Sequence, residues 1–211
     1  MAEAVSAGDF LAWGAEAGIG FDPRYPDSDC LVLLPPRECS RFWVVPDHPY
    51  SIPHLVEAVL DGLDQWETGY LWPRIGRWPT GADPGLPNER VRDVVWRALG
   101  MPAGWAGPAR VGRDERPFVV AALFASLALG GDTCSDLYFM PNHGRQIVWA
   151  GHHDVIHIEC ADEARMLEVV RHLERAGFAL PTEPPDGTFR WPDWMPQDPA
   201  EPDASENGGE R

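Results

Sequence analysis

The feature of this sequence that most constrains its fold is a run of three strand-like segments close to one another, at 136–140, 146–150 and 154–160. The first two flank the turn sequence Pro-Asn-His-Gly at 141–144, and the third alternates polar with β-branched residues, which is the period of a strand. Strands joined by connections this short pair antiparallel. The sequence therefore predicts a β-meander.

Periodic apolar residues outside the meander predict the remaining elements. Strand patterns occur at 30–34 and 41–45, and helical patterns occur at 9–17, 51–66, 88–99, 114–129 and 162–176. The segment 114–129 is apolar on nearly all sides, so we expect it to be the central core helix. Together these elements predict an α+β fold, with an antiparallel sheet of about five strands and helices packed on one side.

The composition of the chain changes after Pro181. We expect residues 1–181 to form a single α+β domain and residues 182–211 to form an acidic, Pro-rich tail. This tail holds eight acidic residues, with only Arg190 and Arg211 as bases. From about residue 196 it has no core-forming side chain larger than alanine, which predicts disorder there.

The charge balance excludes several kinds of partner. Seventeen basic residues, all arginine, stand against 33 acidic ones, for a net charge of −16. This charge opposes phosphate backbones and anionic lipids, so we expect no nucleic-acid and no membrane partner, whereas a basic protein partner fits it. The absence of lysine excludes a Schiff-base lysine or a phosphate-loop lysine. No signal-peptide pattern opens the sequence, so we expect a cytoplasmic protein.

The third strand of the meander carries the strongest concentration of polar chemistry. Alternation places His153, His157 and Glu159 on one face, but His153 and His157 are about 13 Å apart at ~3.3 Å per residue. His157 and Glu159, joined by His143 from the turn, could hold a metal for a metal-assisted hydrolase. We favour a partly hydrated polar sheet face with no metal or cofactor, because no spacing such as HExxH occurs.

The segment 66–78 is the best candidate for a binding surface. Tryptophan, tyrosine and arginine anchor interfaces because they combine a large rigid area with a polar group. The candidate binding residues are Trp72, Arg74, Arg77 and Trp78. The alternative is that Trp66 and Trp72 fill the core and the arginines stack over them, as ten tryptophans in one chain indicate.

Two resemblances follow from these motifs. The run 136–146 together with 152–157, and the Phe-Trp-Val-Val-Pro sequence at 42–46, look like a family of bacterial proteins without assigned activity. The meander with its His-Asp turn and the acidic balance also resemble immunity proteins of the SMI1/KNR4 type. That second resemblance implies an acidic, cytosolic, non-enzymatic α+β protein.

Two classes of function remain. No nucleophile elbow of the GxSxG kind and no GxGxxG after a strand occur in the sequence. We therefore expect a non-catalytic binding protein, such as an immunity or regulatory factor, that acts through protein–protein contact. The alternative is the metal-assisted hydrolase centred on His143, His153, His157 and Glu159.

Overall fold

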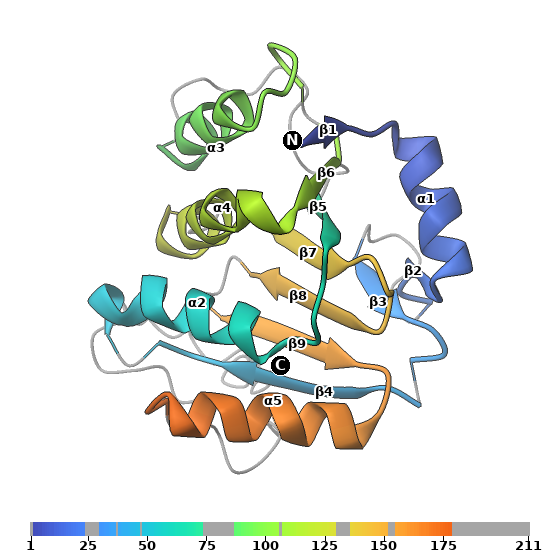
Figure 1. The fold of residues 1–211 in the computed structure, drawn as a ribbon, viewed down its shortest axis with the longest axis vertical. Coiled ribbons are helices and arrows are strands. Elements are labelled where there is room, and N and C mark those ends of the chain that lie inside the picture. The colour runs from blue at the N-terminus through green and yellow to red at the C-terminus, as the bar shows by residue number, and fades with distance from the viewer. Residues whose placement is uncertain are drawn as a thin grey trace, which may run out of the picture.

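The computed structural model describes residues 2–23, 30–36, 38–46, 48–73, 87–105, 107–129, 136–151 and 155–178. It has an α+β fold built on a seven-stranded antiparallel sheet with the strand order β1-β6-β5-β7-β8-β9-β4 (Figure 1). Its strands are β1 (Glu3–Ala4), β4 (Ser40–Val44), β5 (Thr68–Pro73), β6 (Ala109–Gly112), β7 (Leu137–Pro141), β8 (Gln146–Ala150) and β9 (Ile156–Cys160). The strands β2 (Ile19–Phe21) and β3 (Leu31–Leu33) form a separate antiparallel pair.

Within the described residues, five α-helices accompany the sheet, and side-chain caps explain where two of them begin. They are α1 (Ala7–Glu16), α2 (Ile52–Gly62), α3 (Pro87–Ala98), α4 (Arg116–Leu129) and α5 (Glu163–Arg175), with short 3-10 turns at Pro49–Ser51 and Arg113–Glu115. Asp162 caps α5 by accepting a hydrogen bond from the Arg165 backbone N–H at 2.9 Å. Ser6 caps α1, because its hydroxyl accepts a hydrogen bond from the Asp9 backbone N–H.

The predicted meander is confirmed as β7, β8 and β9, but the sheet has more strands than the sequence indicates. β1 has two residues and β6 has four, which is too short for a recognisable period of two. β5 lies in the segment that we interpreted as a binding surface, and it pairs with both β6 and β7 in the sheet. The α+β prediction therefore holds with seven strands in place of about five.

The sheet is covered on both faces. α2, α3, α4 and α5 pack on one face, where α4 contributes Val119, Leu123 and Leu127 to the core. α1, β2 and β3 pack on the other face, where Phe10 of α1 is part of a second core cluster with Leu33 and Trp72. The helices are therefore not confined to one side, because α1 lies opposite the other four (Figure 1). We call α1, β2 and β3 the covering layer.

Within the described residues, none of the helices is long and apolar enough to cross a membrane. The predicted domain boundary at residue 181 and the tail at 182–211 lie outside the described residues.

Candidate functional site

Strand register places five ring-bearing side chains in one row on the face beneath the covering layer. The pairs run from Trp72 on β5 to Tyr138, Trp149, His157 and finally Trp43 on β4. Trp149 stacks on His157 with ring centroids 4.2 Å apart and planes 6° apart, and on Tyr138 at 5.6 Å. Trp43 meets His157 edge to face at 6.0 Å. We call these five residues the aromatic row.

The aromatic row passes from the core towards solvent. Trp72 and Tyr138 are buried, and Phe10 of α1 stacks on Trp72 at 4.3 Å. Trp149, His157 and Trp43 are half-buried. These three side chains form the open end of the aromatic row, and each is held on a separate strand.

Glu159 lies on the same face of β9 as His157 but is sealed from solvent. Its side chain is 0 % exposed, and its Oε1 lies 2.6 Å from Nε of Arg41 on β4. Its Oε2 accepts a hydrogen bond from the Leu33 backbone N–H of β3 at 2.9 Å. Burial and the charge of Glu159 raise the pKa of the neighbouring Cys39 thiol, while Arg41 opposes that rise.

This burial corrects our expectation of a hydrated polar face. His157 is half-buried and fits the expectation, but Glu159 does not, because β3 covers it. The period of the strand shows which side chains share a face, but it gives no information about an element that packs over that face from elsewhere in the chain.

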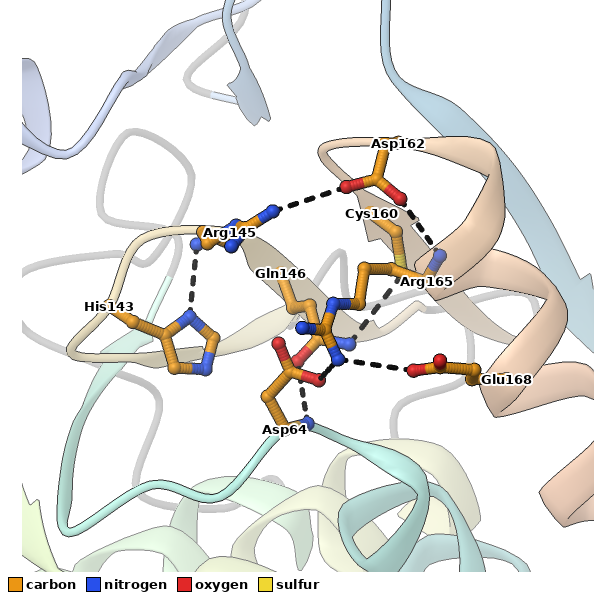
Figure 2. A network of polar contacts seen from close by, with 8 residues as sticks. All are labelled: Asp64, His143, Arg145, Gln146, Cys160, Asp162, Arg165 and Glu168. Carbon is orange, nitrogen blue, oxygen red and sulfur yellow. Dashed lines mark hydrogen bonds and ion pairs between the residues drawn. The ribbon is translucent and has the colours of Figure 1, made fainter.

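A second group of polar side chains gathers where the β7–β8 turn meets the start of α5 and the end of α2 (Figure 2). Arg165 Nη1 lies 2.7 Å from Asp64 Oδ1 and 3.1 Å from Glu168 Oε2. Arg145 pairs with Asp162 at 3.2 Å. We call this group the polar network; it consists of Asp64, His143, Arg145, Gln146, Cys160, Asp162, Arg165 and Glu168.

The polar network is anchored by two buried side chains. Gln146 is fully buried, and its Oε1 accepts a hydrogen bond from the Asp64 backbone N–H at 2.8 Å. Its Nε2 lies 3.7 Å from the Cys160 sulfur. Burial raises the pKa of the Cys160 thiol to about 12. Cys160 is therefore protonated at neutral pH and cannot act as a nucleophile there.

His143 occupies the edge of the polar network. Its Nδ1 accepts a hydrogen bond from the Arg145 backbone N–H at 3.1 Å, while its Nε2 is buried and makes no hydrogen bond within the described part of the chain. Burial lowers the pKa of His143; the Asp64 carboxylate opposes this shift, and Arg145 and Arg165 add to it. His143 is therefore a neutral imidazole at pH 7.

The structure does not bring the candidate metal ligands together. His143 lies in the turn beside the Gln146–Cys160 pair, whereas His157 pairs with Trp149 further along β8 and β9. Glu159 is occupied by Arg41 and Leu33, and His153 lies outside the described residues. Among the residues whose positions are described, no three His, Cys, Asp or Glu side chains form a group that could hold a metal ion.

Of the four candidate binding residues, the structure describes only Trp72. Trp72 is 3 % exposed and Trp66 is 2 % exposed, so both fill the core and neither presents its ring to a partner. Arg74, Arg77 and Trp78 lie outside the described residues. The sequence interpretation missed Trp43 and Trp149, because only the pairing of β4 and β8 with β9 places them on either side of His157.

Comparison of the chain with family models, with curated proteins and with solved structures finds no match. The two family resemblances therefore stay predictions, and the geometry of the molecule carries the functional argument.

Proposed function

We propose that this is a non-catalytic binding protein that recognises a protein partner through the open end of the aromatic row. The observation that carries this proposal is the partial exposure of Trp149, His157 and Trp43 on three adjacent strands. Large aromatic side chains contribute much of the binding energy at protein interfaces. Stacking within the row holds these rings before a partner arrives, which reduces the entropy lost on binding.

The charge of the chain suggests the chemistry of the partner. A net charge of −16 favours encounter with a basic protein and disfavours a phosphate backbone. We propose that the protein acts in the cytoplasm as an immunity or regulatory factor, which is the role that the resemblance to immunity proteins implies.

The geometry supports the metal-assisted hydrolase less well. That function needs His143, His157 and Glu159 to converge on one point, but His143 lies in the turn before β8, whereas His157 pairs with Trp149 near the far end of that strand. The Glu159 carboxylate also already neutralises Arg41. Elemental analysis of purified protein that found one zinc, manganese or iron per chain would favour the hydrolase over the binding protein.

The proposal is tested by quantitative affinity capture from cells of the source species. The immobilised wild-type chain is compared with Trp43→Ala and with the control Leu167→Ala, which truncates a 43 % exposed side chain on α5. We expect a partner that wild type and the control retain equally and that Trp43→Ala binds at least about tenfold more weakly, as for an interface hot spot. Equal retention by all three proteins would refute the proposed surface.

A further inference from the structure

The ring of His143 accepts a hydrogen bond from the backbone of its own turn, and this bond depends on the protonation state of the ring. In the neutral ring, Nδ1 is an acceptor, and it takes the Arg145 backbone N–H at 3.1 Å. In the protonated ring, both nitrogens carry hydrogen, so Nδ1 can no longer accept. Protonation therefore removes this hydrogen bond and leaves two N–H groups facing each other.

The same turn is in contact with the covering layer. Gly144 has φ +68°, and a Cβ built on it would lie 2.4 Å from Ala17 Cβ and 2.7 Å from the Ala17 carbonyl oxygen. The turn backbone is thus in direct contact with the C-terminal cap of α1. Gly18 comes directly after Ala17, and its carbonyl oxygen accepts a hydrogen bond from the Leu34 backbone N–H. This bond links the end of α1 to the residue that follows β3. A shift of the turn is therefore transmitted to α1, β2 and β3.

We infer that His143 is a pH-sensitive contact that holds the covering layer on the sheet, and that acidification loosens this layer by breaking the hydrogen bond from Arg145 to His143. The device goes beyond the proposed binding function and does not depend on it. Its consequence is local, because the helices on the other face of the sheet belong to a different core cluster.

The charged groups around His143 determine the direction of the effect. Asp64, from the segment between α2 and β5, favours the protonated ring, whereas Arg145 of the turn and Arg165 of α5 disfavour it. Glu16, the last residue of α1, is exposed. Burial outweighs Asp64, so the pKa of His143 is lower in the folded chain than its ordinary value near 6.5. The contact is therefore intact at neutral pH, and it is lost only as the pH falls through the lowered pKa of His143.

Three variants test the role of His143, two at this position and one at a second histidine. Asparagine at 143 keeps an acceptor at the position of Nδ1 and does not titrate, so His143→Asn should make the contact insensitive to pH. His143→Leu removes the acceptor at every pH. His48 uses its Nδ1 in the same way, accepting from the Tyr50 backbone N–H at 3.2 Å, but it is exposed and directly precedes the 3-10 turn that leads into α2, on the other face of the sheet. His48→Asn is therefore the control.

Hydrogen exchange at about pH 7.5 and about pH 5 tests the inference, with each amide rate divided by its intrinsic rate at the same pH. In the wild type and in His48→Asn, protection within residues 7–21 should fall about fivefold to tenfold on acidification, which corresponds to one hydrogen bond of about 1 kcal/mol. His143→Asn should keep its protection, and His143→Leu should have low protection at both pH values.

Three results would overturn the inference. The first is that acidification does not lower amide protection within residues 7–21 of the wild type. The second is that His143→Asn loses as much protection as the wild type. The third is that protection falls equally in α2 and α4. The last result would mean that acid weakens the whole fold and not the covering layer alone. The comparison of wild type with His143→Asn decides the matter even if His143→Leu fails to fold.

Discussion

Two arginine–carboxylate pairs in this molecule have nearly the same length but lie in different surroundings. Arg41 and Glu159 are 2.6 Å apart, with a carboxylate that is 0 % exposed, beneath β3. Arg165 and Asp64 are 2.7 Å apart, with side chains that are 37 % and 21 % exposed. Water screens the second pair more than the first, because the Glu159 carboxylate is sealed, so removing one partner should cost more in the first pair at equal distance.

The comparison also shows what each pair does for the fold. Glu159 joins β9 to β4 through Arg41 and to β3 through Leu33, so it links the sheet to the covering layer. Asp64 and Arg165 tie the segment after α2 to α5. The buried, neutral side chain of Gln146 ties the same segment to β8 and, through Cys160, to β9. Burial, and not formal charge, marks the polar groups that the fold depends on.

The largest effect is expected from Arg41→Met. This change keeps an apolar stem but leaves the Glu159 carboxylate buried without its cation, which should cost about 3 kcal/mol of unfolding free energy. The value is at the low end of the usual range because Arg41 itself is 26 % exposed. Urea unfolding measures it. The double variant Arg41→Met with Glu159→Gln keeps an acceptor for Leu33 and should recover much of the loss; no recovery would contradict this explanation.

A smaller effect is expected from Gln146→Leu, which has a similar volume. It removes the acceptor of the Asp64 backbone N–H and should destabilise the chain by about 1–3 kcal/mol. Thermal unfolding at two protein concentrations gives the value and excludes association as its cause. If this variant were as stable as wild type, the buried polar groups of the polar network would matter no more than its exposed ion pairs.

A smaller effect still is expected from Arg165→Met. It removes the ion pairs with Asp64 and Glu168, which are partly exposed, and should change the unfolding free energy by about 0–1 kcal/mol. The same urea experiment in high salt should reduce the difference further, because salt screens exposed charges. A loss as large as that of Arg41→Met would remove the distinction between the two pairs.

The smallest effect is expected for alkylation of the Cys160 thiol, which should not react in the folded protein. With a pKa raised to about 12, Cys160 is almost entirely protonated at pH 8, whereas half-exposed Cys30 is accessible to reagent. Brief alkylation with iodoacetamide followed by peptide mass spectrometry should find Cys30 modified and Cys160 unmodified in the folded protein. Unfolding in urea before alkylation should make both react, and modification of Cys160 in the native protein would contradict its burial.

The sequence by itself determined the elements whose signals are local. The turn at 141–144, the period of two in the meander and the helical period at 162–176 all depend on residues within a few positions of one another. The apolar helix α4 was also predictable, because its composition alone requires burial. These features are properties of short segments, and short segments are what a sequence pattern describes.

Only the tertiary structure decided the site. The partner of Glu159 comes from β4 and its cover from β3, and the rings beside His157 come from β4 and β8. Register between strands and the packing of a covering layer depend on the total apolar area that the whole chain can bury, and no segment carries that information alone. For that reason, the sequence placed Glu159 beside His157 on one face, but only the fold sealed the carboxylate and left the imidazole half-exposed.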